Sequence, residues 1–130
     1  MMLEKYLRQL ITEFKLDPLT PLDENKMFSL KLSGFDIFLK HLDPGVYLHA
    51  KITQLLPEYR KEEALSLLMK ANFLGQGTGG CTIGLTEDES FLTLSSGLPY
   101  DMNYKEFKES LEDFVNFLDY WKIKITSKQG

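Results

Sequence analysis

The glycine-rich segment at residues 75–80 offers the first chemistry to consider in this sequence. Gly75, Gly77 and Gly80 satisfy G-x-G-x-x-G, the spacing with which a loop holds the phosphates of a dinucleotide. That site needs a strand before the loop and a helix after it, so that the phosphate lies at a helix N-terminus. Here the order is reversed, because the pattern predicts a helix at 59–74 and a strand at 81–86. We therefore expect a structural turn in which glycines end the helix and redirect the chain: Gly75, Gly77, Gly79 and Gly80.

The histidines, the cysteine and the carboxylates form no catalytic or metal-binding motif. The predicted strand pairing places His41 on the core side of a sheet and His49 on the other side, so the two rings do not converge on a metal. Cys81 falls on the buried face of a predicted strand, where a small inert side chain is the usual occupant. We therefore expect no enzyme, no metal and no cofactor. An enzyme that pairs His49 with a neighbouring Asp or Glu is an alternative that no motif supports.

The composition is typical of one globular domain. The 130 residues are 43% hydrophobic and 26% charged, and no apolar run approaches membrane-spanning length. The net charge of −4 argues against a nucleic acid partner. A single cysteine and the lack of a secretory signal fit a reducing cytoplasm. We expect a single domain at 1–125, followed by a flexible tail at 126–130.

An amphipathic helix opens the chain and ends before Pro18. Its apolar residues recur at helical spacing: Leu3, Tyr6, Leu7, Leu10, Ile11 and Phe14. Three strands follow, and the first two are joined by a two-residue turn at Ser33-Gly34. That turn pairs apolar residues on one face and an opposite charge on the other: Leu32 with Phe35, Leu30 with Ile37, Phe28 with Leu39, and Lys31 with Asp36.

The next turn, at residues 43–46, is expected to bring Ala50 opposite Leu39 and Ile52 opposite Ile37. The other face of these strands then carries more apolar side chains than a plain solvent face requires: Phe38, Leu42 and Tyr47. Either a covering helix or an exposed binding patch explains them.

The remaining elements are a second hairpin and a last helix. Through a turn at Asp88-Glu89, the hairpin sets Leu85 opposite Leu92 and Ile83 opposite Leu94. The last helix starts near Asn103 with Glu106 in capping-box position, and its apolar stripe is interpreted as core packing. The order is helix, three strands, helix, two strands, helix. This is an α+β domain with an antiparallel twisted sheet flanked by helices.

The middle helix, at 59–74, is apolar over well over half of its circumference. Such a helix is buried on two sides. In a chain of this size the sheet covers one side, and a second copy of the same helix is the simplest cover for the other, as in a symmetric dimer.

The segment from Leu68 to Leu85, which contains the glycine run, resembles class I type III secretion chaperones, the Tir chaperone family. The resemblance continues through Phe91–Ser95, the Leu98-Pro99 step and the amphipathic final helix. Phe73 departs from the family, in which many members have Leu. The first sixty residues are similar in pattern only.

The resemblance implies a homodimeric, non-enzymatic chaperone of the bacterial cytoplasm. Such a protein binds the N-terminal region of one or more secreted effectors, keeps it extended, and presents it to the export apparatus and its ATPase. Mapped onto this sequence, the dimer interface would include Leu65, Leu68, Met69, Asn72 and Ile83. The effector would contact Leu7 or Ile11 together with Phe38, Leu42 and Tyr47.

A carrier of a small ligand is an alternative from a different class. A lipid or metabolite would lie between the sheet and the end helices, lined by aromatic residues of the last helix. This alternative predicts a cavity in a monomer and gives no reason for the doubly apolar middle helix. Homodimer and heterodimer with a related chaperone both stay open, and no membrane or nucleic acid partner is expected.

Overall fold

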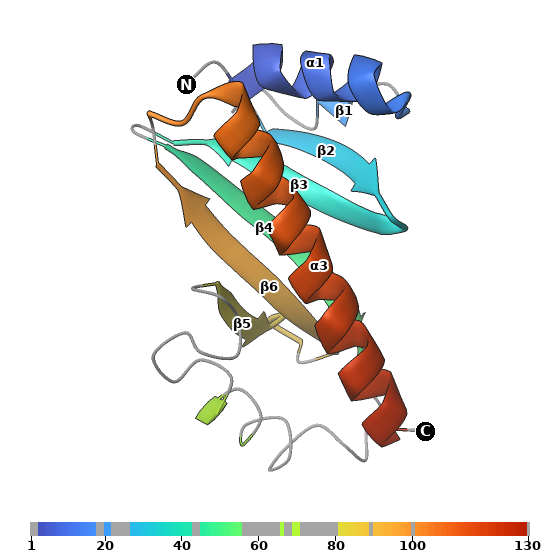
Figure 1. Ribbon diagram of the computed structural model, residues 1–130. Coiled ribbons are helices and arrows are strands. Elements are labelled where there is room, and N and C mark those ends of the chain that lie inside the picture. The colour runs from blue at the N-terminus through green and yellow to red at the C-terminus, as the bar shows by residue number, and fades with distance from the viewer. Residues whose placement is uncertain are drawn as a thin grey trace.

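The computed structural model describes most of the chain: residues 3–17, 20–21, 27–42, 45–55, 66, 69–70, 81–88, 90–99 and 101–129. The elements follow in this order: α1 (Leu3–Phe14), β1 (Thr20–Pro21), β2 (Met27–Leu32), β3 (Phe35–His41), β4 (Val46–Gln54), β5 (Thr82–Leu85), β6 (Phe91–Leu98) and α3 (Tyr104–Gln129). The fold is α+β, and apart from the added strand β1 the described helices and strands follow the expected order (Figure 1).

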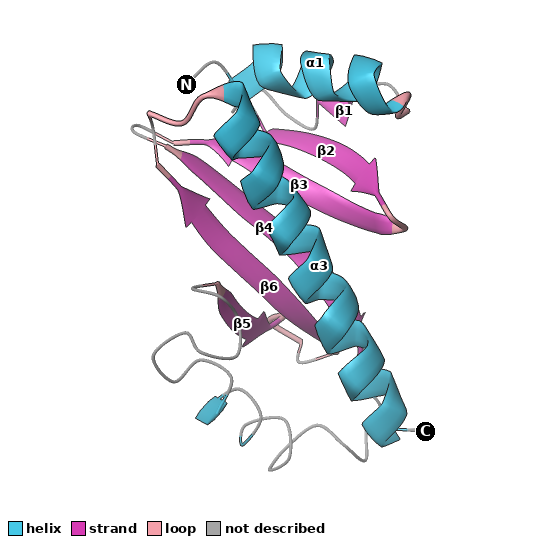
Figure 2. Ribbon diagram, in the orientation of Figure 1, coloured by secondary structure: helices cyan, strands magenta, loops and turns pink. Residues whose placement is uncertain are grey.

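One antiparallel sheet holds the six strands of the described residues, in the order β1-β2-β3-β4-β6-β5. Helix α3 runs diagonally across one face of this sheet, and α1 lies near its β2 end (Figure 2). Both helices bury their apolar stripes in one core with the same face of the strands, as Leu7, Leu39, Leu48, Leu94 and Phe114 show. The opposite face of the sheet is therefore covered by neither helix.

The β2–β3 hairpin has the predicted register. Leu30 pairs with Ile37, and Lys31 pairs with Asp36. Ser33 and Gly34 both have positive φ, at 51° and 84°, which is the conformation of a type I′ turn. The right-handed twist of that turn matches the twist of the strands, so this short loop determines the pairing of the whole hairpin.

The predicted pairing of β3 with β4 is wrong by two residues. Ile37 pairs with Ala50 rather than with Ile52, and Leu39 pairs with Leu48 rather than with Ala50. The turn is tighter than expected, because the amide of Leu42 donates to the carbonyl of Gly45 at 2.8 Å. A shift of two residues leaves every side chain on its original face, so the alternating pattern alone does not distinguish the two registers.

The second hairpin has the predicted pairs, Ile83 with Leu94 and Leu85 with Leu92. The Asp88 carboxylate organises its turn by accepting from the Ser90 hydroxyl at 2.6 Å, the Thr86 hydroxyl at 2.7 Å and the Ser90 amide at 3.1 Å. These hydrogen bonds, that of the Ser90 side chain foremost, lower the pKa of Asp88 to about 2. The hairpin joins the meander through pairing of β6 with β4, which the sequence did not predict.

Helix α3 begins with the predicted capping box. The Glu106 amide donates to the Asn103 side-chain oxygen at 2.8 Å, and the Asn103 amide donates to the Glu106 carboxylate at 3.2 Å. The helix continues through Gln129, past residue 125 at which we expected the folded domain to end. The domain limits stay a prediction.

One observed strand was not predicted, and one predicted helix lies mostly outside the described residues. Strand β1 was not predicted, since two residues that include a proline read as a turn, yet it pairs with Phe28 and Ser29. The predicted middle helix and the glycine run lie outside the described residues, apart from Ser66 and Met69–Lys70, which are helical.

Candidate binding surfaces

The sheet face turned away from α1 and α3 is called the outer face here. Alternation along β3, β4 and β6 places these side chains on it: Phe38, Lys40, Tyr47, His49, Lys51 and Ser95. Tyr47 is 37% exposed, and Leu42, at the end of β3, is 40% exposed. Phe38 is half-buried and lies opposite His49. The three apolar residues singled out from the sequence therefore share this face.

A hydrogen-bonded cluster occupies the middle of the outer face. The Tyr47 hydroxyl donates to Ser95 Oγ at 3.0 Å, and His49 Nδ1 lies 2.8 Å from the same oxygen. The rings of Tyr47 and His49 stack with their centroids 6.0 Å apart. The strands thus hold Tyr47 in one orientation while leaving part of its ring exposed, which favours a binding role since little side-chain entropy is lost on contact.

The imidazole of His49 is partly buried in this cluster. Burial lowers the pKa of His49, and the charge of Lys51 adds to the effect, so the ring is neutral at neutral pH. Its hydrogen-bond partner is Ser95; no carboxylate among the described residues orients it as a general base. His41 is exposed at the end of β3, and the described part of the chain contains no group of metal-binding side chains.

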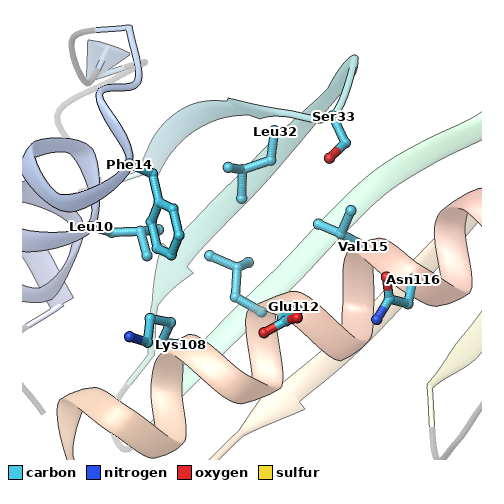
Figure 3. A pocket seen from close by; sticks show the side chains of 9 residues that line it. Leu10, Phe14, Leu32, Ser33, Lys108, Glu112, Val115 and Asn116 are labelled. Atoms are coloured by element: carbon cyan, nitrogen blue, oxygen red, sulfur yellow. The ribbon is translucent and has the colours of Figure 1, made fainter.

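A second surface is an apolar groove on the helical side of the sheet, with a cavity volume of about 340 Å³. Its walls come from α1, the β2–β3 turn and α3: Leu10, Phe14, Leu32, Ser33, Lys108, Leu111, Glu112, Val115 and Asn116. Figure 3 shows Leu10, Phe14, Leu32 and Val115 facing one another across it. Phe14 is 53% exposed, so an apolar side chain from outside has access to the groove.

Sequence reasoning missed this groove. The sequence analysis placed Phe14 in the apolar stripe of the first helix and interpreted the apolar stripe of the last helix as core packing. Whether two stripes meet fully or leave a gap depends on how the helices cross, and the spacing of residues in each helix does not report that crossing. The groove is lined by aliphatic residues of α3, whereas the aromatic Phe107 and Phe114 are fully buried, unlike the arrangement expected for the ligand carrier.

Polar contacts at the rim of the groove hold α1 against α3. The Glu13 carboxylate accepts from Tyr104 at 2.6 Å and from Lys108 at 2.9 Å. These two hydrogen bonds, that of Tyr104 first, lower the pKa of Glu13. Burial and the Glu13 contact raise the pKa of Tyr104 to about 12. The Tyr6 hydroxyl adds a bond to the carbonyl of Met102 at 3.1 Å.

The residues suggested for effector binding do not all lie at a surface. Leu7 is fully buried beneath α1, so it belongs to the core rather than to an exposed partner surface. Ile11 is partly buried against the same core. Leu7 is buried because the apolar stripe of an end helix covers the sheet, and the most central member of the stripe is enclosed in doing so.

The residues suggested for the dimer interface also differ in their exposure. Ile83 is buried within its own chain, at 2% exposure, whereas Met69 is 76% exposed. Leu65, Leu68 and Asn72 lie outside the described residues. Cys81 is half-buried near the core, and burial raises the pKa of its thiol, which keeps it protonated and unreactive.

Comparison with known proteins decides the family. Residues 5–122 match the Tir chaperone protein (CesT) family. The chain belongs to the Tir chaperone family. A Chlamydia pneumoniae relative, the protein CPj0713/CpB0740, is 25% identical over 122 residues, which are 92% of this chain and 93% of the relative.

Solved structures of low sequence identity share the fold. ExsC in its complex with ExsE superposes with a TM-score of 0.78 at 17% identity, covering 95% of this chain and 92% of that one. The Yersinia pestis type III secretion chaperone SycH, in complex with a fragment of YscM2, superposes with a TM-score of 0.65 at 14% identity. The match covers 93% of this chain and 97% of that one. Within the described residues, no helix combines the length and apolar character needed to cross a membrane.

Proposed function

We propose that this protein is a type III secretion chaperone that binds the N-terminal segment of one or more secreted effectors. The observation that carries the proposal is the family match over residues 5–122. The chaperone keeps its client extended and competent for secretion and delivers it to the export apparatus, including its ATPase. It acts in the bacterial cytoplasm and itself catalyses no reaction.

The two surfaces suit an extended client. Phe38, Leu42 and Tyr47 offer apolar contact on the outer face, and the groove beside Phe14 accepts a single apolar side chain. A client that is ordered on binding loses chain entropy, so several separate apolar contacts are needed to compensate for that loss. Ile11, which is partly buried against the core, completes the set of client contacts that we retain from the sequence.

We also propose a homodimer formed through the segment that contains Met69. This side chain is 76% exposed in the single chain, the largest exposed fraction among the large apolar side chains that the structure describes. Burial against a second copy removes that surface from water. Two copies of the client surface then act on one effector chain.

Copurification tests the proposed function. The chaperone is expressed together with tagged N-terminal regions of proteins secreted by the same bacterium, and we expect at least one to be recovered in a stable complex. Limited proteolysis is expected to spare the bound segment only while the chaperone is present. If no secreted protein is recovered with the wild-type chaperone, the proposal is wrong.

A matched pair of tyrosine variants locates the contact. Tyr47 on the outer face and Tyr120 on α3 are both exposed, at 37% and 52%. We expect Tyr47→Ala to weaken client binding about tenfold, as truncation of an aromatic contact does, while Tyr120→Ala leaves it unchanged. Equal losses in the two variants would argue that the outer face is not the client surface.

A further inference from the structure

The net charge of the outer face is opposite in sign to the net charge of the whole protein. The chain carries a net charge of −4. The outer positions of β2, β3 and β4 nevertheless hold three lysines and one acidic residue, Lys31, Lys40, Lys51 and Asp36. Asp36 lies opposite Lys31, and the register that sets Ile37 opposite Ala50 brings it beside Lys51 as well, so the four side chains carry a net charge of two positive units. The row of Lys40 holds no carboxylate, and the row of Lys51 holds two lysines and one carboxylate.

These two lysines flank the aromatic cluster in a regular order. Lys40 lies opposite Tyr47, and Phe38 lies opposite His49, one row further along the sheet. Lys51 follows His49 by two residues and occupies the next row of the same face. Since a strand rises about 3.4 Å per residue, the rows of Lys40 and Lys51 are separated by roughly 14 Å.

Both lysines are available to a partner. Lys51 is exposed, and its ammonium lies 4.5 Å from the centre of the Phe91 ring, a contact that leaves the charge at the surface. Lys40 is half-buried beside Tyr47. The row between them is apolar and neutral, because Phe38 carries no charge and His49 is held in its neutral form.

We propose that the outer face binds an extended segment with two acidic side chains flanking an apolar one, in the order acid, any residue, apolar, any residue, acid. In an extended chain alternate side chains point to the same side, so these three positions match the three rows of the sheet. The apolar residue contacts Phe38, and the acids meet Lys40 and Lys51. This inference rests on the proposed function, since the segment belongs to the client.

Charge complementarity favours an acidic protein segment over nucleic acid. The overall negative charge of the protein repels a polyanion at long range, whereas a short peptide with two carboxylates senses mainly the nearby lysines. The preference for acidic peptides is therefore local and weakens as salt is added.

Synthetic peptides of about ten residues test the inference. One carries the acid–apolar–acid pattern, and a second replaces each acid by its amide; binding of both is followed by fluorescence anisotropy. We expect the acidic peptide to bind about tenfold more tightly at low salt, with the difference shrinking as salt is added. Equal affinities, or no measurable binding of the acidic peptide, would overturn the inference.

Matched double variants locate the charges. The first double variant changes the charge of the outer face and combines Lys40→Glu with Lys51→Glu. The control makes the same change in net charge at exposed positions of α1 and α3 and combines Lys5→Glu with Lys105→Glu. Melting curves establish that both fold. We expect the first double variant alone to abolish the preference for the acidic peptide. Equal losses in both variants, or tighter binding of a single-stranded oligonucleotide than of the peptide, would overturn the inference.

Recovery of the client complex distinguishes failure of the acidic-segment inference from failure of the proposed chaperone function. If a secreted client is recovered equally with the wild type and with the outer-face double variant, the acidic-segment inference fails and the chaperone function stands. If no secreted client is recovered with the wild type, the chaperone function itself fails.

Discussion

At Gly45 the backbone leaves no room for a side chain. Its φ of 105° lies in the left-handed region, and a Cβ atom would lie 2.7 Å from the carbonyl oxygen of Leu98. The position closes the β3–β4 turn, where the amide of Leu42 donates to the Gly45 carbonyl. The tight turn depends on this residue, and with it the register that the sequence analysis predicted wrongly by two residues.

Replacement of Gly45 by alanine is expected to destabilise the fold by about 2–4 kcal/mol, because backbone strain adds to a contact with backbone atoms that do not yield. Urea unfolding measures the loss. Gly34→Ala is the control: it has φ of 84° but no atom near the new methyl group, so we expect it to cost about 1 kcal/mol. Equal losses at the two positions would show that the contact with Leu98 is unimportant.

His49 gives the stability a predictable dependence on pH. Burial lowers its pKa in the folded state, so below the ordinary value of about 6.5 the unfolded chain binds the proton more readily. The stability associated with His49 is therefore complete above that pH and is lost as the pH falls from there through the lowered pKa of the folded state. We expect His49→Gln to flatten the decline in unfolding free energy between about pH 7 and pH 5.

Urea titrations at several pH values test this expectation. His41→Gln serves as the matched control because His41 is exposed at the end of β3, so this variant should follow the wild type. An unchanged slope in His49→Gln would contradict the burial argument.

At the scale of elements, α1 both covers the core and borders the apolar groove. Leu3, Leu7 and Leu10 are buried under the helix, while Phe14 at its end stays 53% exposed beside the groove. The Glu13 contacts with Tyr104 and Lys108 join this end of α1 to α3. One helix thus supplies stability at its centre and apolar surface at its C-terminal end.

Alanine substitutions along α1 should separate these two roles. We expect Leu7→Ala to lower the free energy of unfolding by about 2–5 kcal/mol, as removal of a fully buried leucine does. Ile11→Ala, at a partly buried position, should cost roughly half as much. Urea unfolding measures both. If Leu7→Ala left the midpoint unchanged, its place in the core would be wrong.

At the scale of the whole molecule, the described chain leaves apolar surface that a partner would cover. Met69 is 76% exposed, and Leu42 and Tyr47 add to the exposed apolar area of the outer face. The chain alone therefore accounts for a folded domain, whereas the proposed chaperone acts as part of a larger assembly with a second copy and a client.

Light scattering after size exclusion tests the dimer. We expect a mass of about twice 15.0 kDa for the wild type, and a shift toward the monomer for Met69→Glu, because a charge in a dimer interface is desolvated without a partner. Ile123→Glu changes an apolar residue of α3 that is likewise exposed, at 61%, and should leave the mass unchanged. A folded wild-type monomer would contradict the proposed dimer.

The sequence by itself determined most of the described elements and the pairings within both hairpins. The α1 stripe, the Ser33-Gly34 turn, the capping box of α3 and the pairs within both hairpins depend on residues a few positions apart, so their types and spacing specify them. The motif around the glycine run also pointed to the Tir chaperone family, which the family match confirms.

Only the tertiary structure decided how these elements meet. The β3–β4 register required the geometry of the Gly45 turn, because an alternating pattern is unchanged by a shift of two residues. The pairing of β4 with β6, the burial of Leu7 and the groove between α1 and α3 depend on contacts between residues far apart in the chain. Such contacts reflect the packing of whole surfaces, which local spacing does not encode.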